Sequence, residues 1–131
     1  MSHHCSTCIV RCIDFRLGKA IHELHEEENL YGDADVISVA GACKGLNEDR
    51  GGFVDQQIEL SKKLHDIKTI VLINHTDCGA YGGAAAFPGP EAEREHHQAQ
   101  LRQAKDYLEQ KHPGLTVKVM LANQRFVVDA V

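Results

Sequence analysis

Short apolar runs alternate along the chain with longer segments in which apolar residues recur every three or four positions. The runs at residues 8–13, 36–40, 69–74 and 115–122 are rich in β-branched residues, and this pattern is typical of buried strands. The run over 69–74, Thr-Ile-Val-Leu-Ile-Asn, is uncharged and has the strongest strand character. We therefore expect it to lie at the centre of a sheet.

The segments between these runs predict amphipathic helices over residues 18–30, 53–67 and 91–111. The expected apolar stripe of the second helix is Phe53, Leu60, Leu64 and Ile67, flanked by Val54 and Ile58, and that of the third is Ala92, Ala99, Leu101, Ala104 and Leu108. Glycine-rich segments over 41–52 and 79–90 are expected to be loops, the latter with a short turn of helix. Residues 123–131 predict an edge strand or a packing tail.

Strands that alternate with helices indicate βαβ units, which form a mainly parallel sheet with helices on both faces. We predict a three-layer α/β fold with four to five strands in the order 2-1-3-4. At 131 residues the chain is long enough for one core only, so residues 1–131 are expected to form a single domain, with residues 1–7 flexible.

Composition excludes several classes of protein. A net charge of −5 does not suit nucleic-acid binding, which draws on a basic surface. No apolar run approaches the roughly 20 residues that a membrane span requires, and the first residues do not resemble a signal peptide. Five cysteines without an export signal favour metal binding or free thiols over disulfides, so we expect a cytoplasmic protein.

Two motifs carry the chemistry: Cys12-Ile-Asp14-Phe-Arg16 near the start and His75-Thr-Asp-Cys78-Gly in the middle. Cys12 ends the first strand and His75 follows the third, so the two motifs meet if these strands are neighbours, at the sheet edge where parallel sheets bind ligands. Two thiolates and one imidazole form a zinc ligand set with one coordination position left open.

The fourth position depends on Asp14 and Arg16. Asp14 could ligate the metal and close the site, or pair with Arg16 and leave room for a reactive water. The alternative interpretation, an ordinary surface ion pair worth about 0–1 kcal/mol, is disfavoured by the flanking ligands. Asp77 lies between two of the expected ligands and is interpreted as a turn or helix-capping residue.

The sequence resembles β-class carbonic anhydrase. The resemblance rests on Cys-x-Asp-x-Arg followed by His-x-x-Cys-Gly and extends through residues 58–80, while residues 36–41 match the second strand of the family and its Ala-Gly ending. It implies that Cys12, His75 and Cys78 bind Zn²⁺ and that Asp14 and Arg16 are the catalytic dyad. It further implies a lyase that hydrates carbon dioxide to bicarbonate through a metal-bound hydroxide, as a homodimer or higher homo-oligomer.

The sequence departs from the family around the substrate pocket, where Ser38-Val39 precedes Ala-Gly in place of the frequent Arg-Asn. Candidates for pocket-lining residues are Phe53, Gln56, Gln57 and Phe87. Two alternatives therefore stay open. One is a zinc hydrolase of a carbon dioxide analogue such as carbonyl sulfide or carbon disulfide, and the other is a zinc-binding protein without catalysis.

Other cysteines and histidines fall outside these motifs. His3, His4, Cys5 and Cys8 could form a second cluster, with Cys5-x-x-Cys8 at zinc spacing, although a chain terminus is usually disordered. The pairs His22/His25 and His96/His97 lie on charged helices and are expected to face solvent, and His65 is expected to end a helix. Nothing in the sequence assigns a role to Cys43.

Overall fold

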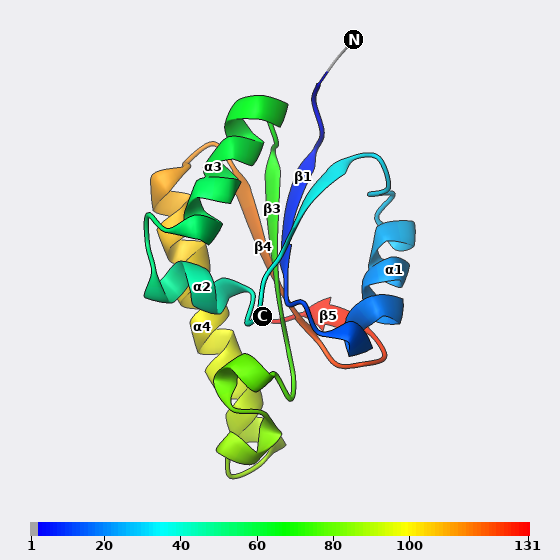
Figure 1. Cartoon of the computed structure of the whole chain (residues 1–131), viewed down its shortest axis with the longest axis vertical. Coiled ribbons are helices and arrows are strands. Elements are labelled where there is room, and N and C mark those ends of the chain that lie inside the picture. Colours follow the sequence, from blue (N-terminus) through cyan, green and yellow to red (C-terminus); the bar gives the residue numbers. More distant parts are fainter. Residues whose placement is uncertain (1–2) are drawn as a thin grey trace.

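A computed structural model describes residues 3–131, which form one twisted sheet flanked by helices (Figure 1). In chain order the elements are β1 (Thr7–Arg11), α1 (Gly18–Glu27), β2 (Ala34–Ser38), α2 (Cys43–Glu48), α3 (Phe53–His65), β3 (Thr69–His75), α4 (Pro90–Lys111), β4 (Thr116–Ala122) and β5 (Val127–Asp129). Single 3-10 turns occur at Phe15–Leu17, Gly79–Tyr81 and Ala84–Ala86.

The sheet has the order β2-β1-β3-β4-β5, with β1 to β4 parallel and β5 antiparallel to β4. This confirms the predicted order 2-1-3-4 and the edge strand near the end of the chain. Strand β5 can turn back because Asn123 closes a tight loop: its side-chain oxygen accepts hydrogen bonds from the backbone N–H groups of Arg125 and Phe126.

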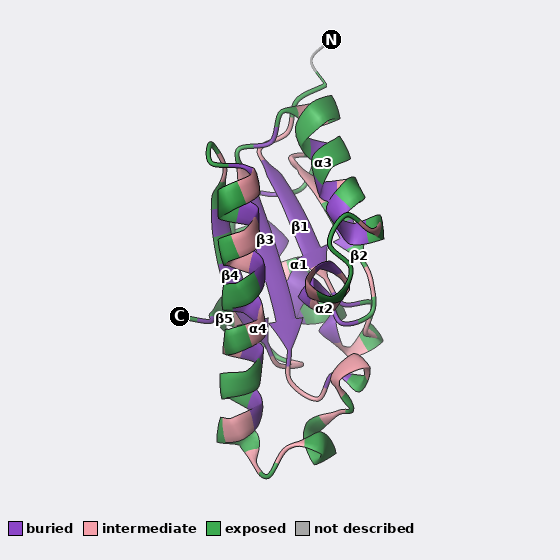
Figure 2. Ribbon diagram, turned by 90° about the vertical axis from the view of Figure 1, so that its left-hand side faces the viewer, coloured by how far each residue is buried: buried purple, intermediate pink, exposed green. Residues whose placement is uncertain are grey.

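Two apolar clusters fill the space on the two faces of the sheet. One lies under α1, and the larger one lies under α2, α3 and α4. Strand β3 is buried from Ile70 to His75, as its uncharged sequence predicts, and Figure 2 shows β1 and β3 buried between the helices. The three-layer α/β architecture is therefore confirmed.

The predicted apolar stripe of α3 was wrong in part, because Ile67 and the flanking positions are buried but the other members are not. Val54, Ile58 and Ser61 face the core, whereas Phe53, Leu60 and Leu64 are exposed, at 64, 44 and 57%. The buried residues have a helical spacing of their own. The rotation of α3 is fixed by the buried Asp55, which bonds to Tyr107 and Lys111 of α4.

The stripe of α4 also differs from the prediction. Its buried positions are Glu93, His97, Leu101, Ala104 and Leu108, whereas Ala99 is exposed. The two polar side chains are buried because their partners lie on the sheet side of the helix: Glu93 accepts the N–H of Asp77, and the Nδ1 atom of His97 lies 3.1 Å from the Nδ2 atom of Asn74.

His22 and His96 are exposed as expected, but His97 and His25 are buried. The prediction failed for His25 because its ring lies under Tyr31, with ring centroids 4.8 Å apart. Its Nδ1 atom is also 2.9 Å from the carbonyl oxygen of Ile21.

Helix α2 occupies part of the segment that was expected to be a loop. Its Cys43 and Leu46 are fully buried in the larger cluster, and the Asn47 amide donates to the carbonyl oxygen of Gln100 on α4. Tertiary packing therefore stabilises a helix that glycine-rich sequence alone does not favour.

The start of the chain is tied to the sheet from Cys5 onward. The Cys5 N–H donates to the carbonyl of His65, the Ser6 N–H donates to Asp33, and Thr7 begins β1. Of the segment 1–7 that the sequence predicts to be flexible, residues 1–2 lie outside the described residues.

Candidate metal centre

The ends of β1 and β3 bring Cys12, His75 and Cys78 together. The two strands are parallel neighbours in which Arg11 pairs with Ile73, so the residues that follow them emerge at the same edge of the sheet. The ligand atoms of the three side chains lie within 4.8 Å of one another, with the two sulfur atoms 3.9 Å apart. All three residues are buried, with exposures of 4, 1 and 2%.

His75 has one ring nitrogen free for a metal. Its Nδ1 atom lies 2.8 Å from the carbonyl oxygen of Thr76, and because a carbonyl only accepts, Nδ1 carries the proton. Its Nε2 atom is buried and has no hydrogen-bond partner among residues 3–131. An unsatisfied buried acceptor costs about 1–3 kcal/mol. A metal ion bound to Nε2 would remove that cost, so the donor set fits Zn²⁺.

The two thiols also suit a cation. The hydrogen bond between the two sulfur atoms favours one thiolate next to one thiol, so it lowers the pKa of Cys12 and raises that of Cys78. Burial lowers the pKa of His75, but the nearby Cys12 sulfur, the hydrogen bond to the Thr76 carbonyl and the charge of Asp14 outweigh burial and raise it. The pair of thiols thus shares a proton that metal binding would release.

Gly41 supports the Cys12 sulfur from the loop after β2. Its N–H lies 3.4 Å from that sulfur, and its backbone has a φ of +80°. A Cβ atom at this position would lie 2.9 Å from the Cβ of Ala80. Both the conformation and the close approach therefore require glycine here.

Gly41→Ala is expected to destabilise the fold by about 1–3 kcal/mol through backbone strain, and to weaken zinc binding about 10- to 100-fold through displacement of the thiolate donor. Thermal unfolding and competitive zinc titration measure the two effects. Gly32→Ala is the matched control, since Gly32 has a φ of +73° and open space around it. Equal zinc affinity in both variants would contradict the role of Gly41.

Asp14 is turned toward Arg16. The guanidinium donates two hydrogen bonds to the carboxylate, with Nη2–Oδ2 at 2.7 Å and Nε–Oδ1 at 3.1 Å. The Arg16 backbone N–H donates a third, to Oδ1 at 2.9 Å. These hydrogen bonds from Arg16 hold the pKa of Asp14 well below its usual range. The Oδ2 atom still lies 3.8 Å from Nε2 of His75, so the carboxylate borders the expected metal position.

Asp77 lies in a turn, as predicted, and also binds Arg16. Its φ of +55° places it in a tight turn, where its carboxylate accepts from Arg16 at 2.9 Å and its carbonyl accepts from Arg16 at 2.8 Å. The turn is held by Ala84, whose N–H donates to the Asp77 carboxylate, and by the buried Glu93, which accepts the Asp77 N–H at 2.7 Å. Arg16 is therefore fixed between Asp14 and Asp77.

A buried polar cluster lies behind His75 at the end of β3. The Cys43 thiol donates to the Asn74 oxygen at 3.1 Å, and the Asn74 nitrogen donates to Tyr81 and to His97, each at 3.1 Å. Burial raises the pKa of Cys43 to about 11 and lowers that of His97 to about 4, so both stay neutral near pH 7. Cys43 is thus a hydrogen-bond donor in this cluster.

The four candidates for pocket-lining residues are placed as follows. The side chain of Phe87 packs on the rings of His96 and His97, with centroids 5.2 and 6.3 Å away. Gln56 donates to the carbonyl of Gly51, Gln57 lines a hollow between α3 and β2, and Phe53 is exposed.

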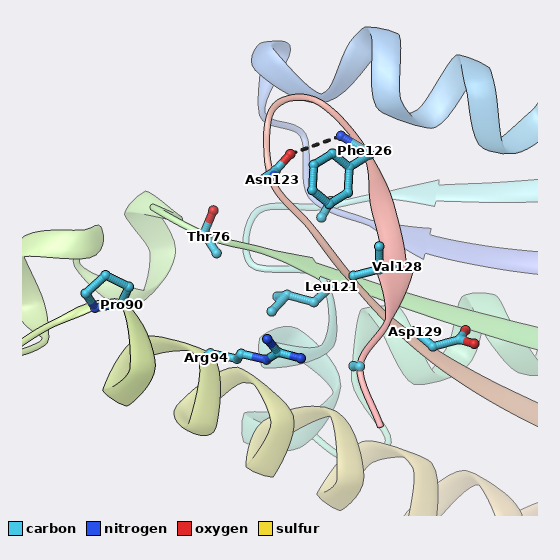
Figure 3. Close-up of a pocket in the computed structure, with 10 residues that line it drawn as sticks. Thr76, Pro90, Arg94, Leu121, Asn123, Phe126, Val128 and Asp129 are labelled. Atoms are coloured by element: carbon cyan, nitrogen blue, oxygen red, sulfur yellow. Dashed lines mark hydrogen bonds between the residues drawn. The ribbon is translucent and has the colours of Figure 1, made fainter.

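An apolar hollow of about 270 Å³ lies beside the site, between β5 and the start of α4 (Figure 3). Thr76, Arg94, Leu121, Phe126 and Val128 are among its lining residues. The lining includes Thr76, which follows His75, but none of Cys12, His75 and Cys78, so this hollow is distinct from the metal centre.

Comparison with known proteins identifies the family of this chain. Residues 1–131 match the family described as "Putative carbonic anhydrase". An uncharacterized protein of Rickettsia conorii is 33% identical over 96% of this chain and 72% of its own length, and one of Rickettsia bellii is 31% identical over 96% and 81%. The chain belongs to this carbonic anhydrase family.

Solved structures agree on the fold. A carbonic anhydrase from Glaciozyma antarctica superposes with a TM-score of 0.64 at 19% identity, over 95% of this chain and 81% of its own. The β-carbonic anhydrase CafA of Aspergillus fumigatus gives 0.54 at 18% identity, over 98% and 77%. The family match confirms the resemblance to carbonic anhydrases that the two motifs indicated, and carbonic anhydrases are lyases. The solved structures confirm the fold.

Among residues 3–131, no helix combines the length and the apolar character that crossing a membrane would require.

Proposed function

We propose that this protein binds Zn²⁺ through Cys12, His75 and Cys78 and catalyses the reversible hydration of carbon dioxide to bicarbonate. One observation carries the proposal: three buried zinc-type ligands converge while the adjacent Asp14 is held by Arg16. Because Asp14 is engaged elsewhere, the fourth position stays available to a water. This arrangement favours a catalytic site over the non-catalytic alternative, in which Asp14 would close the metal site.

Zinc bound there would supply Lewis acidity, which makes water a nucleophile near neutral pH. Asp14 accepts a hydrogen bond from the attacking water and orients its lone pair toward carbon dioxide. Arg16 keeps Asp14 ionised, so that the carboxylate acts only as an acceptor. The carbon–oxygen bond that forms gives bicarbonate, and the proton lost by the water passes to solvent.

The direct test is the hydration rate of purified, zinc-loaded protein, measured by stopped flow at pH 7 and pH 8.5. A rate above the buffer background supports the proposal, and none at either pH overturns it. Parallel assays with carbonyl sulfide and carbon disulfide distinguish a carbonic anhydrase from a hydrolase of these analogues, which would turn them over faster than carbon dioxide. A cobalt-substituted protein whose absorption ignores pH and small anions would indicate a closed, non-catalytic site.

Arg16→Gln is expected to lower the hydration rate about 10- to 100-fold while zinc content is kept, the range seen when groups that orient metal sites are lost. Without the guanidinium, Asp14 is free to turn toward the metal. Stopped-flow rates with metal analysis measure the effect. Arg94→Gln, which removes an exposed arginine of the neighbouring hollow, should leave the rate unchanged. A wild-type rate in Arg16→Gln would contradict the role of the dyad.

We also propose a homodimer or a higher homo-oligomer. Strand β2 is an edge of the sheet, and Val36, Leu60 and Leu64 beside it are 48, 44 and 57% exposed. Pairing two copies over this apolar face would bury these side chains. Sedimentation should show a wild-type dimer and a Leu64→Glu monomer, whereas a wild-type monomer would contradict the assembly.

We retain the cytoplasm as the expected compartment. All five cysteines lie within the described residues and none of them forms a disulfide there, which suits a reducing environment. Fractionation of cells that produce the tagged protein would test this location.

A further inference from the structure

A second group of metal-ligand side chains lies at the opposite end of the sheet from the Cys12–His75–Cys78 centre. Cys5 precedes β1, Asp35 lies in β2 and His65 ends α3, and their ligand atoms lie within 4.8 Å of one another. In Figure 1 the start of β1 and the end of α3 are at one end of the molecule, and the loop after β3 is at the other. We propose that Cys5, Asp35 and His65 form a second zinc site.

The backbone holds these three residues in place. The Cys5 N–H donates to the carbonyl oxygen of His65 at 3.1 Å, which fixes the chain before β1 against the end of α3. Asp35 is held by β2, which pairs with β1 with Asp35 opposite Cys8. The anchored segment before β1, strand β2 and the end of α3 therefore present the ligands, so little conformational entropy is lost when they bind an ion.

The three side chains are close together before any metal binds, and hydrogen bonds hold two of them. One oxygen of Asp35 accepts a hydrogen bond from Ser61 at 2.6 Å and lies 2.7 Å from the Nδ1 atom of His65. The Cys5 thiol donates a hydrogen bond to the carbonyl oxygen of Thr7 at 3.6 Å. In a single protomer the Asp35 and His65 side chains are 31 and 37% exposed, so an ion can reach them from solvent before two copies pair over the adjoining apolar face.

The donor set selects the metal. Thiolate, imidazole and carboxylate together suit Zn²⁺, whereas Ca²⁺ and Mg²⁺ prefer oxygen ligands alone. Tetrahedral zinc with bonds of 2.0–2.3 Å separates its ligand atoms by roughly 3.3–3.8 Å, which small rotations reach from the present positions. Binding would release the thiol proton of Cys5 and break the hydrogen bond between Asp35 and His65.

The site differs from the cluster that the sequence suggested. Cys8 is fully buried in the core with its pKa raised to about 12 by burial, so Cys5-x-x-Cys8 does not form a thiolate pair. His3 and His4 are exposed and immediately precede Cys5, so one of them or a water can complete the tetrahedron. The expected zinc ligands beside Cys5 are Asp35 and His65, which are distant from it in the sequence.

Metal stoichiometry tests the site on the full chain with Co²⁺ and Zn²⁺ alone. Wild-type protein should bind two equivalents, and Cys5→Ser, Asp35→Asn and His65→Gln should each bind one, with at least a 10-fold loss of affinity for the second. Cys5→Ser should also lose one thiolate-to-cobalt absorption component. His22→Gln, which removes an exposed histidine of α1, is the control and should keep two equivalents.

Two results would overturn the second site. One is two equivalents in all three variants, and the other is a second equivalent that depends on His3 and His4 but not on Asp35 or His65. Thermal melts identify any of the three variants that fails to fold. The metal stoichiometry of the remaining variants then tests the second site. The first centre is judged separately: if it fails to bind, wild-type protein holds one equivalent that survives Cys78→Ser and is lost in His65→Gln.

Discussion

Cys78→Ser is expected to empty the Cys12–His75–Cys78 centre and to bring carbon dioxide hydration down to the background rate. Serine replaces a soft thiolate by a hydroxyl that stays protonated near neutral pH, so the metal loses one of its three protein ligands. A Lewis acid supplies several kcal/mol of stabilisation, and about 4 kcal/mol corresponds to a rate loss on the order of 10³-fold. Metal analysis and stopped-flow assays on the same preparation measure both effects.

Cys43→Ser is the matched control for this substitution. It also exchanges a buried thiol for a hydroxyl near the site, and the new hydroxyl can donate to Asn74 as the thiol does. We expect it to keep its zinc and most of its activity. Retention of zinc and activity in Cys78→Ser, or an equal loss in Cys43→Ser, would contradict the assignment of ligands.

Asp55→Asn is expected to lower the free energy of unfolding by about 3 kcal/mol, because the buried carboxylate loses charge-assisted hydrogen bonds that contribute about 1.5–3 kcal/mol each. Asp55 is fully buried in α3, where its carboxylate bonds to Tyr107, to the Gly51 N–H at 2.8 Å and to Lys111 at 2.9 Å. Urea unfolding at pH 7 measures the loss.

Glu59→Gln provides the control, because Glu59 also contacts Lys111, at 2.8 Å, but is half exposed. An exposed ion pair contributes about 0–1 kcal/mol, so this variant should stay close to wild type. A loss in Glu59→Gln that matches the loss in Asp55→Asn would show that burial of Asp55 does not matter.

The effect of Asp55 also depends on pH. Burial raises the pKa of this carboxyl, but hydrogen bonds from Tyr107 and Lys111 outweigh burial and lower it overall. A lowered pKa in the folded state contributes stability above the unfolded value of about 3.9, and that contribution is lost as pH falls through the folded pKa. The difference between wild type and Asp55→Asn should therefore shrink below about pH 4.

The sheet could be predicted from the sequence because its strands are short, apolar and separated by helices. The run over 69–74 predicted the buried central strand β3, and the ends of β1 and β3 then placed Cys12 near His75. Helix faces were harder to predict. Helix α3 has two competing apolar stripes, and only the contacts of Asp55 with α4 decide which of them faces the core.

The partners of Arg16 could not be predicted for a similar reason. Asp77 binds it by adopting a positive φ that non-glycine residues seldom take, and the hydrogen bond that supports this conformation comes from Glu93, sixteen positions along the chain. The spacing of Glu93, His97 and Leu101 on one stripe of α4 was the available signal. It was missed because a charged residue in a buried stripe contradicts the usual pattern.

The hydrogen bond between Glu93 and Asp77 has a consequence for how this site can vary. The three expected zinc ligands come from the ends of β1 and β3 and from the turn that follows β3. The orientation of the Asp14 carboxylate depends instead on Arg16, which is held by Asp77, and Asp77 is held by Glu93 in the first turns of α4. Under the proposed function, the metal ligands and the orientation of Asp14 are therefore set largely by different elements, which meet at the turn of Asp77 and Cys78. We expect substitutions in the first turns of α4 to change turnover more than metal affinity, which would give evolution and protein engineering partly separate control of the two properties.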